Sequence, residues 1–139
     1  MKMTPTGTQA LIIGLILTGT LVTCGFMKLL RSNKILTVLT LVALLIGIYG
    51  LLIRGEETEM PNGNGADFLA APFVYVVSYA LLRMLYKRVY KMEPTYERYS
   101  WYDAKEGRNQ NWLDVTVYIL PMLLSFVVPL MMGKLMFHS

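Results

Sequence analysis

Residues 35–53 read ILTVLTLVALLIGIYGLLI, an apolar stretch without a single charged side chain. A helix needs about 20 apolar residues to cross the ~30 Å hydrocarbon core of a bilayer, and this stretch has that length. Three further apolar stretches of similar length lie at Gln9–Leu30, Phe68–Tyr86 and Val115–Phe137. Because a backbone in lipid must satisfy its own hydrogen bonds, we expect four transmembrane helices, the third extending to about residue 92.

The composition agrees with an all-α integral membrane protein. The chain has 139 residues, of which 55% are hydrophobic, and the four stretches occupy most of it. A soluble domain of at least ~50 residues does not fit between them, so we expect a single membrane domain over residues 1–139 with short loops. The net charge of +4 does not indicate nucleic acid binding, because the basic residues lie beside the apolar stretches.

The distribution of charge predicts the orientation. Two connections on one face are basic, with Lys28, Arg31 and Lys34 near the first and Arg83, Lys87, Arg88, Lys91, Arg98, Lys105 and Arg108 near the third. The opposite face has only Lys2, Arg54 and Lys134, together with the acids Glu56, Glu57, Glu59 and Asp67. The positive-inside rule then puts both termini outside, and a bacterial inner membrane is the expected compartment. Segment 54–66, rich in turn residues, is expected to be a solvated loop.

One short segment competes with this interpretation. Leu21–Gly25 reads LVTCG and resembles a bacterial lipoprotein cleavage box, in which Cys24 would become lipidated. Thr23 is a poor residue before such a cut, and cleavage would force the first basic connection outside. We therefore expect the first helix to be retained. A single cysteine excludes an internal disulfide, so Cys24 is interpreted as a packing residue.

Two helical faces are candidates for partner contacts. Gly14 and Thr18 in the first helix are small and four residues apart, which permits close approach of another helix, either of this chain or of a partner. In the third helix one face carries Tyr75, Tyr79, Arg83, Tyr86 and Tyr90. An aromatic belt with ordinary packing, a protein-docking ridge and a lipid-headgroup site all remain open for this face.

The connection 91–111 is the one sizeable polar segment, and we expect it to be cytoplasmic. Its aromatic residues alternate with charges of both signs; they are Tyr96, Tyr99, Trp101 and Tyr102. Exposed Tyr, Trp and Arg are enriched at protein interfaces. The sequence leaves two interpretations open, a docking surface for a partner and a loop whose rings lie in the headgroup zone.

The fourth helix carries a polar face. It contains Asp114, Tyr118, Pro121, Ser125 and Pro129. Both prolines free a backbone carbonyl, which lipid does not tolerate, so we expect this face to point inward or into a subunit contact. Asp114 suits a helix start, where Asn111 or Asn109 can cap. Because Arg83 also lies near the inner boundary, we predict an ion pair between Arg83 and Asp114.

Familiar catalytic and cofactor motifs are missing from the sequence. His138 is the sole histidine, which excludes a bis-histidine haem or a histidine-built metal site within one chain. No apolar stretch has a charge at its centre, which disfavours a proton-coupled path. The inner-face polar set has no spacing that matches a known reaction; it comprises Glu93, Glu97, Asp103, Glu106, Asp114, Arg98 and Arg108. We predict no catalytic residues, cofactor or metal.

These observations favour a small non-catalytic membrane subunit that scaffolds or anchors partners in a larger membrane complex. Its expected partners are membrane lipid and other integral membrane subunits, with a homo-oligomer also open and no nucleic acid. The alternative is a homo-oligomeric channel or small-solute transporter, in which the fourth helix lines the path and Ser125 contacts the solute. A membrane enzyme acting on lipid at the inner boundary is the third hypothesis.

Overall fold

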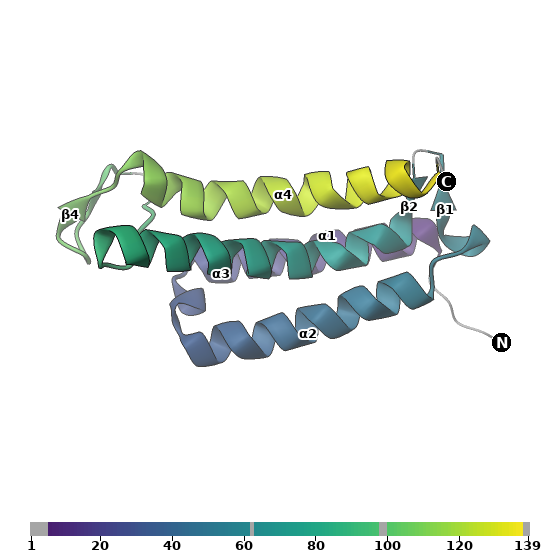
Figure 1. The fold of residues 1–139 in the computed structure, drawn as a ribbon, viewed down its shortest axis with the longest axis horizontal. Helices are drawn as coiled ribbons and strands as arrows, with labels where there is room; N and C mark the ends of the chain where they lie inside the picture. Colours follow the sequence, from purple (N-terminus) through teal and green to yellow (C-terminus); the bar gives the residue numbers. More distant parts are fainter. Residues whose placement is uncertain (1–5, 62, 98–99, 138–139) are drawn as a thin grey trace.

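Four long helices run side by side and reverse direction at each connection in the computed structural model, which describes residues 6–61, 63–97 and 100–137 (Figure 1). The helices are α1 (Gly7–Phe26), α2 (Asn33–Leu52), α3 (Ala71–Tyr90) and α4 (Trp112–Phe137). Four candidate membrane spans, Gly7–Phe26, Asn33–Leu52, Gly65–Tyr90 and Trp112–Leu135, are long and apolar enough to cross a bilayer. The prediction of four long apolar helices is confirmed.

The connections contain short elements at both ends of the bundle. The 3-10 helices are η1 (Leu29–Arg31), η2 (Glu56–Thr58) and η3 (Gly65–Ala70). Two antiparallel pairs of short strands join β1 (Glu59–Met60) to β2 (Gly63–Asn64) and β3 (Tyr102–Asp103) to β4 (Arg108–Asn109). We call residues 91–111 the cap. The cap and the α1–α2 connection lie at one end of the bundle, and η2, β1, β2 and η3 at the other (Figure 1).

Local chemistry sets the ends of the helices. Thr6 and Gln9 form a capping box at the start of α1: the Thr6 N–H donates to the Gln9 side chain at 3.0 Å, and the Gln9 N–H donates to the Thr6 hydroxyl at 3.4 Å. α1 ends at Phe26, four residues before the predicted end, because Lys28 adopts a left-handed backbone (φ 62°) and η1 follows. α3 ends at Tyr90, where Lys91 is left-handed (φ 58°), two residues before the expected end near residue 92.

α3 is the central helix of the bundle. It packs against α4, α2 and α1, and the buried core lies largely along it, with Tyr75, Val76 and Tyr79 fully covered. α2 buries only small residues, namely Ala43, Gly47 and Gly50. Its remaining apolar side chains are partly or fully exposed, as expected of a helix that faces lipid.

The end opposite the cap is held by close backbone contacts. A Cβ at Gly65 would lie 1.9 Å from the carbonyl oxygen of Gly7, so η3 reaches the start of α1 only because Gly65 has no side chain. Asn64 caps η3 by accepting from the Ala66 N–H at 3.0 Å. The predicted solvated loop is right for the exposed Glu56, Glu57 and Glu59. It is wrong for residues 64–66, which are buried because η3 packs between α1 and α2.

Candidate functional site

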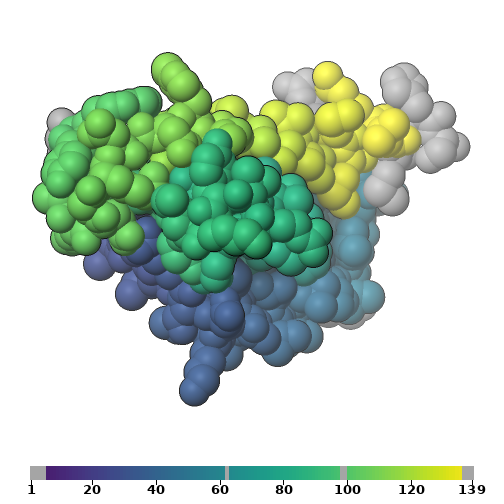
Figure 2. Space-filling model, turned by 60° about the vertical axis from the view of Figure 1, so that its left-hand side comes forward, coloured from purple at the N-terminus to yellow at the C-terminus, as the bar shows by residue number. Residues whose placement is uncertain are grey.

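The cap folds back onto the helix ends instead of projecting from them. Figure 2 shows it as one green mass beside the end of α3 and above the α1–α2 connection. Three groups of polar side chains hold it there, centred on Arg83, Asp114 and Asp103.

Arg83 of α3 joins three segments. Its guanidinium donates from Nε and Nη2 to both carboxylate oxygens of Glu93, at 2.8 and 2.7 Å. It also donates to the Asn33 side chain at 2.9 Å and to the Arg31 carbonyl at 2.6 Å. The planar fork of arginine suits such simultaneous contacts. Arg83 thereby fixes both the start of the cap and the α1–α2 connection against α3.

Asp114 lies fully buried at the start of α4. Arg108 donates two bonds to its carboxylate at 2.8 and 2.9 Å, and the N–H groups of Thr95 and Asn111 each donate at 2.9 Å. Asn111 accepts from the Asp114 N–H at 2.8 Å, so the predicted asparagine cap is confirmed. The hydrogen bonds that Arg108 donates to the Asp114 carboxylate raise the pKa of its guanidinium above the ordinary value.

The predicted ion pair between Arg83 and Asp114 is wrong. Arg83 binds Glu93, and Asp114 binds Arg108. Arg83 and Asp114 both lie near the expected inner boundary of the membrane, but the cap brings a nearer partner to each. Glu93 comes from the segment just after α3, and β4 places Arg108 beside the start of α4.

Asp103 is the buried acid within the cap itself. It accepts from the Lys28 ammonium at 2.6 Å, from the Thr95 hydroxyl, and from the backbone N–H groups of Lys105 and Glu106 at 2.9 and 3.3 Å. Burial opposes ionisation, but the donors outweigh it, led by Lys28, and hold the pKa of Asp103 well below its usual range. Asp103 therefore shapes the β3–β4 turn and binds it to the end of α1.

Further ion pairs strengthen the attachment, among them those of Arg31 and Lys87. Arg31 pairs with Glu106 and donates to the Pro94 carbonyl at 2.6 Å. Lys87 lies 2.9 Å from Glu93. Burial would raise the pKa of Glu93, yet its bonds from Arg83 and Lys87 hold that pKa below its ordinary value.

This arrangement is suited to holding a surface in place. The five described acids at this end, namely Glu93, Glu97, Asp103, Glu106 and Asp114, each have a basic partner. A carboxylate already engaged by several hydrogen-bond donors is poorly placed to accept a proton from a substrate. Within the described residues no cluster of His, Cys, Asp or Glu has the arrangement needed to hold a metal ion.

The tyrosine face of α3 lies inside the bundle. Tyr75, Tyr79 and Tyr86 are buried, and Tyr90, at the end of the face, stacks on Tyr86 with ring centroids 4.7 Å apart. The Tyr86 hydroxyl accepts from Arg108 at 3.1 Å. The structure thus uses the three buried tyrosines for packing within the chain and for holding the cap.

The small residues of α1 also face their own chain. A Cβ at Gly14 would lie 2.3 Å from the Phe68 carbonyl oxygen of η3, and Thr18 is buried with its hydroxyl donating to the Gly14 carbonyl at 2.7 Å. Of the two hypotheses for this stripe, the structure shows the contact within the chain.

The polar face of α4 points inward. Tyr118, Pro121, Ser125 and Pro129 are all buried. The Tyr118 hydroxyl donates to the Pro94 carbonyl at 3.2 Å, which attaches the cap to α4. The Ser125 hydroxyl donates to the Met122 carbonyl at 2.7 Å, so it is occupied within its own helix.

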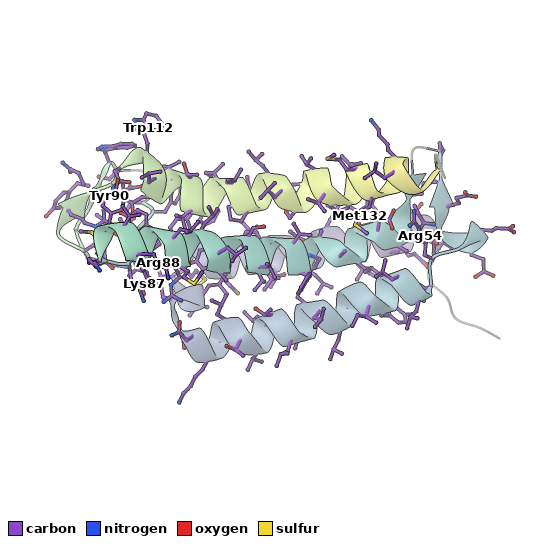
Figure 3. The ribbon with its side chains drawn as sticks, viewed as in Figure 1. Arg54, Lys87, Arg88, Tyr90, Trp112 and Met132 are labelled. Carbon is purple, nitrogen blue, oxygen red and sulfur yellow. The ribbon has the colours of Figure 1, made fainter. Side chains whose placement is uncertain are left out.

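The aromatic side chains of the cap divide into two groups. Tyr96 is half-buried and stacks on Phe26 of α1 at 5.1 Å. Trp101 and Tyr102 are each 51% exposed. Trp112, which the sequence did not single out as a contact residue, meets Trp101 edge-on at 5.6 Å and points away from the bundle (Figure 3). The predicted contact residue Tyr99 lies outside the described residues, as does Arg98.

Comparison with protein-family models, with curated proteins and with solved structures finds no match to this chain.

Proposed function

We propose that this chain is a non-catalytic integral membrane subunit that presents its cap to a partner in a larger membrane complex. The observation that carries the proposal is a combination. The cap is fastened by buried ion pairs, yet its Trp101 and Tyr102 are exposed, as is Trp112 beside them at the start of α4. Tryptophan and tyrosine are enriched among the residues that dominate binding energy. A surface already held in one conformation loses little entropy on binding.

The cap is proposed to face the cytoplasm, with both termini outside a bacterial inner membrane. The charge distribution supports this orientation. Lys87 and Arg88 lie at the cap end and Arg54 at the other (Figure 3). Residues 55–67, at the end opposite the cap, contain the four acids Glu56, Glu57, Glu59 and Asp67 and no base. A surplus of Lys and Arg marks the cytoplasmic side of membrane proteins.

Cysteine labelling tests the orientation. In a Cys24→Ser background, Ser100→Cys in the cap and Gly55→Cys at the opposite end are both exposed. An impermeant maleimide added to intact spheroplasts should label Gly55→Cys at once and Ser100→Cys only after lysis. The reverse pattern would contradict the proposed orientation.

The channel alternative receives less support from the geometry. A pore-lining α4 needs its polar face open to solvent in an assembly. Here Ser125 and Pro129 are buried within one copy, and the Ser125 hydroxyl already has an acceptor. The polar face of α4 is therefore better explained as internal packing.

Native mass spectrometry of tagged protein, extracted in mild detergent, tests the subunit proposal. The wild-type chain should carry unrelated membrane chains at fixed stoichiometry, and Trp101→Ala/Tyr102→Ala should lose them. Tyr49→Ala is the matched control, because Tyr49 is an exposed aromatic residue on α2, away from the cap. A wild-type chain that appears alone, or only with copies of itself, would contradict the proposal. Equal behaviour of both variants would assign the cap aromatics to the lipid interface.

A further inference from the structure

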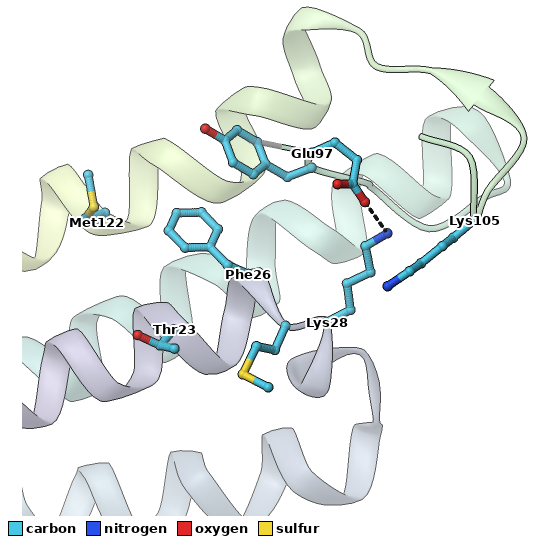
Figure 4. Close-up of a pocket in the computed structure, with 8 residues that line it drawn as sticks. Thr23, Phe26, Lys28, Glu97, Lys105 and Met122 are labelled. Atoms are coloured by element: carbon cyan, nitrogen blue, oxygen red, sulfur yellow. Dashed lines mark ion pairs between the residues drawn. The ribbon is translucent and has the colours of Figure 1, made fainter. Parts of the chain in front are cut away.

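A hollow of about 660 Å³ lies between the end of α1, the cap and α4 (Figure 4). Its helix side is formed by Thr23, Phe26 and Met122, and its cap side by Lys28, Lys105 and Glu97. The helix-side residues belong to candidate membrane spans, and the cap-side residues lie just beyond them. With these candidate spans placed in a bilayer, the hollow would lie where lipid headgroups meet hydrocarbon.

The hollow has a preformed aromatic wall on one side and lies between α1 and α4. Tyr96 stacks between Phe26, at 5.1 Å, and Tyr118, at 5.6 Å, which fixes the cap against the end of α1. α4 packs chiefly on α3 and only slightly on α1. The space between α1 and α4 is flanked by Phe26 and Met122, apolar side chains suited to an acyl chain.

The charges at this end leave a positive surplus. Every described acid of the cap has a basic partner, as shown above, whereas within the described residues Lys34, Arg88, Lys91 and Lys105 have no acidic partner in an ion pair. Of these four, only Lys105 lines the hollow. Figure 4 shows its side chain directed toward Lys28.

The Lys28 ammonium can donate a further hydrogen bond to an anion. Its ammonium lies 2.6 Å from the buried Asp103 but 3.6 Å from Glu97, whose side chain is 36% exposed. An ammonium has three donors, and the looser contact is readily replaced by a phosphate oxygen. We propose that this hollow binds one anionic phospholipid, with the phosphate between Lys105 and Lys28 and an acyl chain along Phe26 and Met122.

Lipid titration followed by native mass spectrometry tests the site. The full chain, delipidated in detergent, is titrated with phosphatidylglycerol and separately with phosphatidylcholine. One phosphatidylglycerol should bind saturably and more tightly than phosphatidylcholine. Lys105→Gln should weaken its binding about fivefold, since a lysine at an anionic lipid surface contributes about 1 kcal/mol. The Lys105 side chain makes no ion pair among the described residues, so the cap should stay folded in this variant.

Lys34→Gln is the matched control, because Lys34 is an exposed base at the same end and does not line the hollow. Its binding of phosphatidylglycerol should change less than twofold, while Glu97→Gln should bind at least as tightly as the wild type. Equal weakening by Lys105→Gln and Lys34→Gln would show diffuse attraction and overturn the site. Equal affinity for the two lipids would also overturn it. Displacement of the lipid by inorganic phosphate would assign the hollow to a soluble anion and overturn the lipid proposal.

Discussion

The two ends of the bundle are closed by different physical means. At the cap end, charged side chains from distant parts of the sequence meet, as when Lys28 binds Asp103 across 75 residues. At the opposite end, the backbones of Gly7 and Gly65 lie in close contact. Asn64 caps η3 through a local hydrogen bond to the Ala66 N–H. Charged pairs are therefore more numerous at the cap end, whereas the opposite end combines close backbone contact with one described ion pair, Arg54–Asp67 at 3.4 Å.

The largest expected effect comes from Asp114→Ala at the cap end. Removing one partner of a buried ion pair costs about 3–5 kcal/mol, and we expect about 3 because Arg108 keeps some access to water. The free energy of unfolding is measured by SDS titration in mixed micelles. Glu97→Gln, which removes only a loose exposed pair, is the control and should cost less than about 0.5 kcal/mol. An Asp114→Ala variant as stable as the control would contradict the described cap.

The second prediction concerns a substitution that destabilises the end opposite the cap. Gly65→Ala places a Cβ where the Gly7 carbonyl now lies, so η3 must move away from α1. Overpacking of this kind costs about 1–3 kcal/mol. The same titration should leave Gly55→Ala unchanged, because a Cβ at Gly55 meets no atom within 4 Å. Equal stability of the two variants would refute the close contact at this end.

Lowering the pH should weaken the attachment of the cap without any mutation. The pKa values of Asp103 and Glu93 are lowered in the folded chain from ordinary values of 3.8 and 4.5. Their contribution to stability is therefore complete above about pH 5 and is lost as the pH falls below about 4. Both tryptophans lie at the cap end, so their fluorescence reports on it directly.

The fluorescence should stay constant between pH 8 and 5 and change below 4. Asp103→Asn should weaken this acid transition, because the titrating group is removed. A transition of the wild-type chain near pH 6 would show that the carboxylates are not held by the donors described.

The smallest expected effect concerns the displayed surface. Trp112→Ala removes an edge-on contact with Trp101 whose rings are largely exposed. Aromatic pairs contribute ~0.5–1.5 kcal/mol, and we expect about 0.5 at this exposed position. Unfolding in SDS should match that of Tyr49→Ala within error. A loss as large as that of Asp114→Ala would place Trp112 in the structural core of the cap and remove it from the proposed docking surface.

The sequence predicted the features that depend on local composition. Apolar stretches such as 35–53 predict helices by length and hydropathy alone. The capping of the start of α4 by Asn111 was also predictable, because Asn111 lies three residues before Asp114, from whose N–H it accepts a hydrogen bond. Likewise, the freed carbonyls implied by Pro121 and Pro129 predicted the buried face of α4.

The partners of the charges were not predictable in the same way. Arg83 and Asp114 were expected to pair because both lie near the same end of their spans. The position of a residue along a span, however, does not determine the path of the cap backbone. The β3–β4 hairpin brings Arg108 to Asp114, and no helical period encodes that turn. The sequence analysis placed Asp103 only in a general polar set, since its partner Lys28 belongs to another connection. The tyrosines of α3 share a face in sequence, but only the packed fold shows that this face is internal.

Amide hydrogen exchange across the cap tests the central claim most directly, since that claim is a cap already folded in the isolated chain. The N–H groups of Thr95, Lys105, Gly107 and Gln110 all donate within the cap or to Asp114. In detergent, without any partner, these amides should exchange as slowly as those at the ends of the helices. Exchange at the rate of an unstructured peptide would contradict the account, because the cap would then be ordered only on binding.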